Sequence, residues 1–149
     1  MATSRTSRRG TSFVLDPTLA ADAIAVGELG LCRVLLMNDR RFPWLILVPR
    51  RGGKRDLVDL STGDQARLTA DMSRAARALK ALFSPHKLNV AALGNVVAQL
   101  HVHVIARQTT DAAWPRPVWG VGKTEPYAPS ERDDLVRRLR EELGRKPAS

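Results

Sequence analysis

The sequence predicts an α+β fold in which an antiparallel sheet packs against one long helix and a C-terminal helix. Two observations carry this prediction. Along the chain the apolar pattern switches between helical and strand-like spacing, in the order helix, hairpin, helix, hairpin, helix. The chain has 149 residues, which suits a single domain that buries a sizeable core without disulfides. We expect a basic, disordered tail over residues 1–12 and one domain over residues 13–149.

The first elements are a short helix and a hairpin. Residues 16–30 begin with an Asp-Pro cap signal, hold a short helical pattern and end in glycine. Residues 31–39 are rich in leucine and β-branched side chains, and residues 44–50 form a second run of the same kind. Because so few residues separate these two runs, a β-hairpin is the simplest connection between them.

A long helix and a second pair of strands follow. Residues 61–83 carry apolar side chains at helical spacing, with arginine and lysine on the other face. Residues 88–94 and 99–107 predict two further strands. Residues 109–130 contain four prolines, which predicts an ordered loop or an extended arm.

The last predicted element is a helix over residues 130–144. Ser130 is the expected N-cap, and Asp133 lies at the capping-box position in place of the usual Glu or Gln. With this helix the pattern is complete, and it fits an antiparallel sheet with helices packed on it.

The composition limits the classes of protein to which the chain can belong. Its formal net charge of +9 favours anionic partners such as phosphate groups or nucleic acid. No apolar run approaches the ~18 residues of a membrane span, and no hydrophobic segment follows the basic N-terminus as in a secretory signal. The single cysteine, Cys32, cannot form an internal disulfide, so we expect a cytoplasmic protein that does not bind membranes.

The stretch NVVAQLHVHVIAR, residues 95–107, holds two histidines in an otherwise mostly aliphatic run. Side chains alternate between the two faces of a strand, so Gln99, His101 and His103 should share one face. The aliphatic residues between them should fill the core. The strand is therefore expected to have an apolar inner face and a nitrogen-bearing outer face.

Three interpretations of this pattern remain open from the residues alone. The histidines can lie on a solvated sheet face without a chemical role. They can bind zinc, but the other soft ligands, Cys32 and His86, have no ligand spacing, so we expect no metal site. A neutral imidazole can also attack phosphorus and form a covalent intermediate. In that case Asn95 and backbone amides near Gly94 are suitable donors to the phosphate oxygens.

The segment QLHVHVI resembles the motif of the histidine triad (HIT) superfamily, in which three histidines alternate with hydrophobic residues. The preceding hairpin, VLLMNDRRFPWLILVPRR, and the long helix after it also resemble that family. The likeness covers about residues 30–107. It implies a HIT-like antiparallel sheet, and it places Gln99 at the position of the first histidine of the triad.

The resemblance also implies roles for individual residues. His101 falls on the family's nucleophile, and His103 on the residue that helps to orient and polarise the phosphate. Asn95, with Gly94 beside it, falls in the loop that contacts phosphate oxygens. Asn38 or Asp39 falls where the family hydrogen-bonds the ribose hydroxyls.

The chain departs from the family pattern at two positions. Gln99 cannot titrate near neutral pH, and Trp44 stands where family members often carry a further histidine. Both changes should weaken proton delivery to a poor leaving group. Two more tryptophans, Trp114 and Trp119, either pack the proline-rich arm onto the body or a second subunit, or form a wall for the base or leaving group.

The resemblance implies a nucleotide-binding hydrolase or nucleotidyl transferase that acts at an α-phosphate through a nucleotidyl-histidine and needs no cofactor. It also implies dinucleoside polyphosphates, nucleoside phosphoramidates or adenylylated adducts as substrates, and a homodimer. The alternative is a non-catalytic nucleotide-binding module. An RNA-associated basic protein is a third option. The sequence does not favour it, because it contains no aromatic-rich basic strand of the kind that binds RNA.

Overall fold

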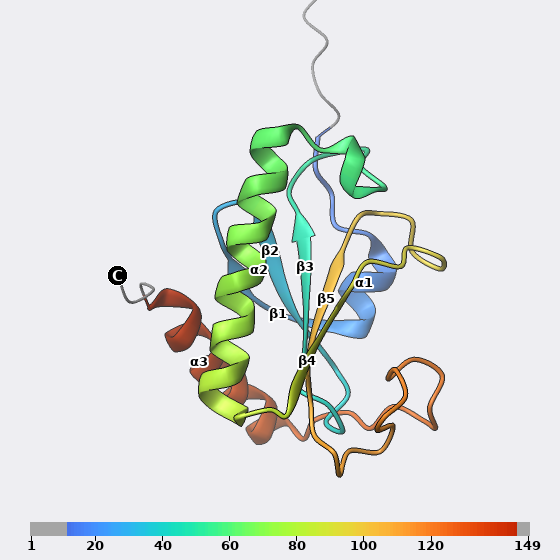
Figure 1. The fold of residues 1–149 in the computed structure, drawn as a ribbon, viewed down its shortest axis with the longest axis vertical. Coiled ribbons are helices and arrows are strands. Elements are labelled where there is room, and N and C mark those ends of the chain that lie inside the picture. The colour runs from blue at the N-terminus through green and yellow to red at the C-terminus, as the bar shows by residue number, and fades with distance from the viewer. Residues whose placement is uncertain (1–11, 146–149) are drawn as a thin grey trace, which may run out of the picture.

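The computed structural model describes residues 12–145, which form one antiparallel sheet with helices packed on it (Figure 1). The strands are β1 (Ala23–Glu28), β2 (Cys32–Met37), β3 (Trp44–Pro49), β4 (Lys87–Ala91) and β5 (Val102–Arg107), in the order β1-β2-β3-β5-β4. The helices are α1 (Pro17–Asp22), α2 (Thr62–Phe83) and α3 (Pro129–Gly144), with a 3-10 turn at Leu57–Asp59. The predicted α+β class and the β2–β3 hairpin are confirmed. The predicted tail over residues 1–12 lies, except for Ser12, outside the described residues.

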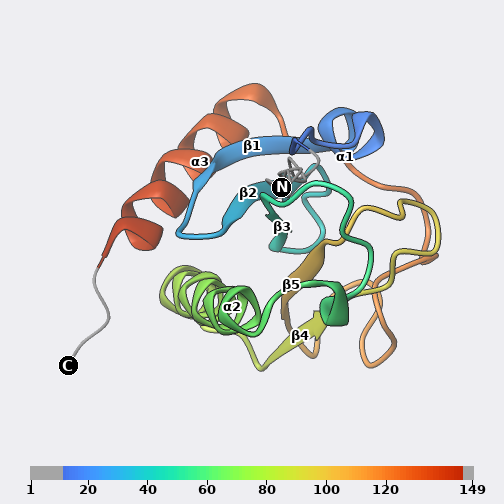
Figure 2. The ribbon, with the colours of Figure 1, turned by 90° about the horizontal axis from the view of Figure 1, so that it is seen from above.

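Both faces of the sheet are covered, as the view along it shows (Figure 2). Helices α2 and α3 lie on one face, where Val102 and Val104 of β5 and the preceding Leu100 join the larger apolar core, as predicted. The other face lies under α1 and two loops, and there Ile46 and Ile105 belong to a second core. Among residues 12–145, no helix is both long enough and apolar enough to cross a membrane.

Helix α2 forms as its pattern predicts. The Ser61 hydroxyl caps it by accepting from the backbone N–H of Asp64 at 3.1 Å. Leu68, Ala75 and Leu79 lie on its buried face. Burial of one such leucine contributes about 1.5–3 kcal/mol to folding, so this apolar stripe fixes the helix on the sheet.

The prediction of helical structure over residues 16–30 is wrong beyond Asp22. Asp16 caps a helix of six residues, and the chain then enters the edge strand β1. Ile24 and Val26, two residues apart, both pack into the core under α3, which is strand spacing rather than helical spacing. Pairing with β2 supplies the backbone hydrogen bonds, so tertiary context overrides the local helical pattern.

The predicted cap of the last helix is also wrong, although the helix itself is present. Helix α3 begins at Pro129, with Ala128 as the N-cap residue, and no side chain caps it. Ser130 and Asp133 therefore lie inside the first turns. Proline suits the first helical position because its missing N–H would have no partner there.

The segment that joins β5 to α3, called the arm below, lies against the body of the protein. Arg107, at the end of β5, is 1% exposed and donates to both carboxylate oxygens of Asp111, at 2.8 and 3.1 Å. Its guanidinium also lies 5.5 Å from the ring centroid of Trp114. Farther along, Arg41 Nη1 donates to the carbonyl of Val121 at 2.6 Å. These anchors fix the arm on its own chain.

Exposed apolar side chains gather elsewhere, around the edge strand β4 and the turns beside it. Val58 is 83% exposed, Val90 of β4 is 48% exposed, and Val96 in the next loop is 94% exposed. An apolar surface of this kind beside an open sheet edge is typical of an interaction site.

We expect the protein to be a homodimer that buries this edge. Light scattering after gel filtration should give twice the monomer mass at tens of micromolar protein. Val90→Lys should shift the mass toward the monomer, because it places a charge in the interface. Ala70→Lys, on the exposed face of α2, adds the same charge and should leave the dimer intact. A monomer mass for the unmodified protein would contradict the prediction.

Candidate active site

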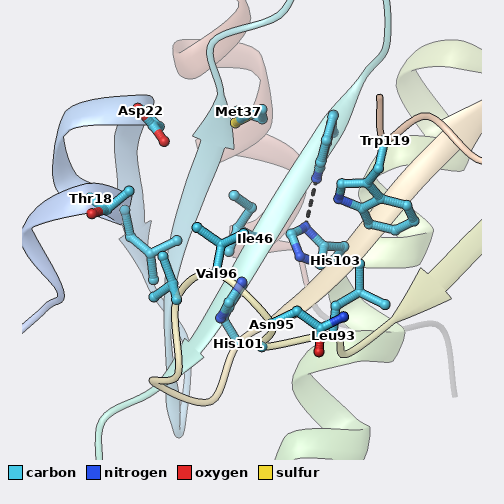
Figure 3. A pocket seen from close by; sticks show the side chains of 14 residues that line it. Thr18, Asp22, Met37, Ile46, Leu93, Asn95, Val96, His101, His103 and Trp119 are labelled. Carbon is cyan, nitrogen blue, oxygen red and sulfur yellow. Dashed lines mark hydrogen bonds between the residues drawn. The ribbon is translucent and has the colours of Figure 1, made fainter. Parts of the chain in front are cut away.

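A cavity of about 210 Å³ lies on the sheet face opposite α2, between α1 and the loop that joins β4 to β5 (Figure 3). Most of its lining is apolar. Ile46 of β3 lies at its base, Leu19 of α1 and Val97 of the loop form walls, and Trp119 of the arm closes one side. The few polar groups are Thr18, Asp22, Asn95, His101 and His103. An apolar cavity with a few converging polar groups is the usual form of a small-molecule site.

Both histidines of the motif lie at this cavity (Figure 3). His101 and His103 are each 6% exposed, and their ring centroids are 4.9 Å apart. The prediction that they face the same way is confirmed. The prediction that they face outward is wrong, because α1, the β4–β5 loop and Trp119 cover this face of the sheet.

A backbone hydrogen bond fixes the tautomer of His101. Its Nδ1 lies 2.6 Å from the carbonyl oxygen of Gln99. A carbonyl can only accept, so the proton of a neutral His101 is on Nδ1. The other ring nitrogen, Nε2, then carries a lone pair on a side chain that lines the cavity. This is the protonation state that a nucleophilic imidazole requires.

His103 has the opposite tautomer. Its Nδ1 lies 2.9 Å from Nε1 of Trp44 (the dashed line in Figure 3), and an indole N–H can only donate. The proton of neutral His103 is therefore on Nε2. Burial, with a smaller contribution from His101, lowers the pKa of His103 to about 4. His103 is thus an uncharged donor at neutral pH.

Gln99 does not share the cavity with the two histidines. Its side-chain Oε1 accepts from the backbone N–H of Asp16, and its Nε2 donates to the carbonyl of Val14, each at 2.8 Å. Strand β5 begins only at Val102, so the two-residue alternation does not extend back to residue 99. The side chain instead ties down the segment that leads into α1, while its backbone carbonyl orients His101.

We expect Gln99→Glu to destabilise the protein by about 1–3 kcal/mol at neutral pH, because a carboxylate oxygen would then face the Val14 carbonyl without a proton between them. Urea denaturation measures the change in the free energy of unfolding. Ala70→Glu adds the same charge on the exposed face of α2 and serves as the control. Equal stability of the two variants would show that the amide does not hold the N-terminal segment.

Asn38 and Asp39, the expected ribose ligands, do not line the cavity. The Asn38 side-chain oxygen accepts from the backbone N–H of Tyr127 at 3.0 Å. Asp39 is fully buried and pairs with Arg41 at 2.8 Å. Burial alone would raise the pKa of Asp39, but Arg41 and backbone N–H donors outweigh it and hold the pKa below its usual value. Both side chains hold the arm in place.

Other residues supply the polar groups at that side of the cavity. Thr18 and Asp22 of α1 line it, although no local pattern in the sequence indicates that this helix faces the histidines. Asn95 and Gly94, the predicted phosphate contacts, line it as well. Gly94 has a φ of 72°, a conformation that favours glycine, so the loop turns sharply beside His101.

The three tryptophans divide between two places. Trp44 and Trp119 both line the cavity, and the Trp119 ring lies edge-on to His103 at 5.0 Å. Trp114 packs instead against His86, with ring centroids 5.2 Å apart. In the part of the chain that the structure describes, no three His, Cys, Asp or Glu side chains group closely enough to hold a metal ion.

The comparison with known families decides what kind of domain this is. Residues 18–110 match the HIT domain model. The chain belongs to the HIT domain family. The expectation drawn from the QLHVHVI motif is thereby confirmed at the level of the family.

Solved structures agree with this assignment. A histidine triad protein from Bradyrhizobium japonicum is 46% identical, with a TM-score of 0.87 over 89% of this chain and 98% of that one. One from Sinorhizobium meliloti 1021 is 49% identical, with a TM-score of 0.85 over 87% and 96% of the two chains. A hypothetical histidine triad nucleotide-binding protein from Sulfolobus tokodaii shares the fold at 14% identity, with a TM-score of 0.63 over 85% and 89%. No curated protein matches the sequence closely enough to compare.

The match also shows which part of the cavity belongs to the HIT domain as such. The segment from Thr18 to Thr110 supplies every lining residue except Trp119, which comes from the arm beyond the match. The histidines, α1 and the β4–β5 loop are therefore parts of the HIT domain, and the arm adds one wall to them.

Proposed function

We propose that this HIT domain binds a nucleotide in the cavity and acts at its α-phosphate as a hydrolase or nucleotidyl transferase, through a covalent intermediate on His101. The observation that supports this most directly is the bond from His101 Nδ1 to the Gln99 carbonyl. It leaves the Nε2 lone pair of a buried imidazole at a cavity of ligand-binding character.

The reaction takes two displacements at phosphorus. In the first, the Nε2 lone pair of His101 forms a bond to the α-phosphorus, and the bond from phosphorus to the leaving group breaks. In the second, water or another acceptor attacks the same phosphorus and releases its proton to solvent, and the bond to Nε2 breaks, which returns the neutral imidazole. The ring becomes cationic while it carries the nucleotidyl group, and the Gln99 carbonyl stabilises that charge through Nδ1–H.

Neighbouring donors suit the phosphate. The Nε2–H of His103 and the side-chain amide of Asn95, which also lines the cavity, can donate to its oxygens. The base and ribose would then occupy the apolar part of the cavity, where the hydroxyl of Thr18 and the carboxylate of Asp22 can bond to ribose hydroxyls. The net charge of +9 favours an anionic ligand of this kind.

The candidate substrates are dinucleoside polyphosphates, nucleoside phosphoramidates and adenylylated adducts. Substrates whose leaving group is stable as an anion fit the site best, because His103 is neutral and its Nδ1 is occupied by Trp44. This absence of an acidic imidazole also supports the alternative, a nucleotide-binding module without turnover.

The test is to trap the intermediate. The protein is mixed with a dinucleoside polyphosphate or a nucleoside phosphoramidate, quenched, and measured as intact mass under conditions that preserve phosphoramidate bonds. We expect a gain of one nucleotidyl group, located on His101 by peptide mapping. His86→Ala, a histidine packed on Trp114 outside the cavity, should form the same adduct. Nucleotide binding by calorimetry with neither adduct nor turnover would favour the binding module.

A further inference from the structure

Trp44 makes a single, specific polar contact with the site. It is the first residue of β3 and is 4% exposed. Strand β3 pairs with β5, and in this register Ile46 lies opposite His103. Its indole N–H points at Nδ1 of His103 at 2.9 Å. Trp119 packs edge-on against both rings, at 5.7 Å from Trp44 and 5.0 Å from His103. The pair is therefore buried and held on two sides.

This contact has a chemical consequence because indole has no acceptor. A histidine partner at residue 44 would be able to give or take a proton, whereas Trp44 can only donate. Protonated His103 would carry hydrogen on Nδ1 as well, and two N–H groups would then face each other at hydrogen-bond distance. Charging His103 would thus cost the bond to Trp44 as well as the desolvation of a buried cation.

We propose that Trp44 is a positioning residue that holds His103 as a neutral Nε2–H donor toward the phosphate, so that this donor does not change over the pH range in which imidazole normally titrates. The inference rests on the proposed nucleotide site. On this proposal, the phosphate is held by the N–H dipole of neutral His103. With a histidine that titrates, it would instead be held by a charge that depends on pH.

Few other ionisable groups surround His103. His101 lies beside it on the same segment, and Asp22 lines the same cavity from α1. The residues that face it from β3, from β4 and from the arm are Trp44 with Ile46, Ala91 and Trp119, none of which titrates. The lowered pKa of His103, due first to burial and then to His101, agrees with this arrangement.

The direct test is the tautomer of His103 in the full-length protein. Nitrogen-15 NMR distinguishes a protonated from an unprotonated ring nitrogen. We expect Nδ1 of His103 to stay unprotonated and Nε2 protonated from about pH 5.5 to about pH 8 in the unmodified protein. A His103 that becomes doubly protonated within this range, or that carries its proton on Nδ1, would overturn the proposal without any variant.

The functional test compares Trp44→Phe with the unmodified protein. The probe is adenosine 5′-methyl phosphate, whose single negative charge is constant over this pH range, with its dissociation constant measured by calorimetry. We use the ratio of the two dissociation constants at each pH, so that effects of pH common to both proteins cancel. In the variant no N–H opposes a second proton on Nδ1 of His103, so the affinity for the anionic probe, relative to the unmodified protein, should rise several-fold as the pH falls.

Trp114→Phe is the matched control, because it makes the same change at a tryptophan that packs on His86 outside the cavity and leaves the Trp44 bond in place. Its ratio should be the same at every pH. A flat ratio for Trp44→Phe would overturn the proposal. An intact tautomer together with no adduct on His101 would instead contradict the proposed reaction, and a normal adduct with a titrating His103 would contradict only the role of Trp44.

Discussion

Turnover of a nucleotide substrate should be lost in His101→Ala, by about 10⁴-fold or more in kcat, while nucleotide binding remains measurable. The reason is that the covalent route needs the Nε2 lone pair, and no second free imidazole replaces it. His103, its only near histidine among the described residues, has its Nδ1 occupied by Trp44 and its Nε2 protonated. Steady-state kinetics and calorimetry on the same preparations measure the two quantities.

The control for this variant is His86→Ala, which removes an imidazole that packs on Trp114 instead of lining the cavity. It should retain the activity of the unmodified protein. Activity of a tenth of the unmodified level in His101→Ala would exclude a covalent mechanism on this residue, since loss of a nucleophile has far larger effects.

Removal of the Asp111 carboxylate should lower the free energy of unfolding more than the other substitutions proposed for this protein. Asp111→Ala leaves the guanidinium of Arg107, which is 1% exposed, without its charged partner. Breaking one side of a buried ion pair typically costs about 3–5 kcal/mol. Asn89 and the Arg116 carbonyl would still accept from Arg107, but neither carries a charge. Chemical denaturation of the two proteins at neutral pH measures the loss.

Asp134→Ala is the matched control, because it removes an aspartate that pairs with Arg137 where both side chains are more than half exposed. Exposed pairs contribute about 0–1 kcal/mol, so this variant should be nearly as stable as the unmodified protein. Similar losses in the two variants would mean that the buried pair does not anchor the arm.

The same carboxylate should make stability depend on pH. Burial alone would raise the pKa of Asp111, but Arg107 and the backbone N–H groups of Ala113, Gln108 and Trp114 outweigh it and hold the pKa below its usual value. A lowered folded-state pKa means that this stabilisation is fully present above the unfolded value of about 3.9 and is lost as the pH falls through the folded pKa. Asp111→Asn should therefore show a shallower loss of stability in acid.

The sequence predicted those features that depend on short-range spacing. Helix α2 follows from its apolar stripe, and His101 and His103, two residues apart, line the same cavity as their spacing suggests. The pattern failed where pairing partners decide the structure. Residues 23–28 have a local helical pattern, yet β2 pairs with them and makes them a strand. In the same way, Gln99 lies three residues before β5 begins. The alternation of side chains along that strand therefore does not set the direction of the Gln99 side chain.

The remaining site residues depend on contacts between distant parts of the chain. Asn38 and Asp39 were expected at the ribose, but Tyr127 and Glu125 of the arm take their hydrogen bonds. Nothing in local spacing shows that a segment so far along the chain returns to this turn. The same holds for Trp44, whose effect on His103 appears only when β3 and β5 are placed side by side.

The two arginine anchors of the arm bear on the entropy of ligand binding. Trp119 lies between the Arg107–Asp111 pair and the Arg41–Val121 bond, so the chain is held on both sides of it and each free stretch is short. The conformational entropy of placing this aromatic wall is therefore lost during folding, before any ligand arrives. A nucleotide would meet a preorganised surface, and its binding free energy would not be reduced by the ordering of a loop.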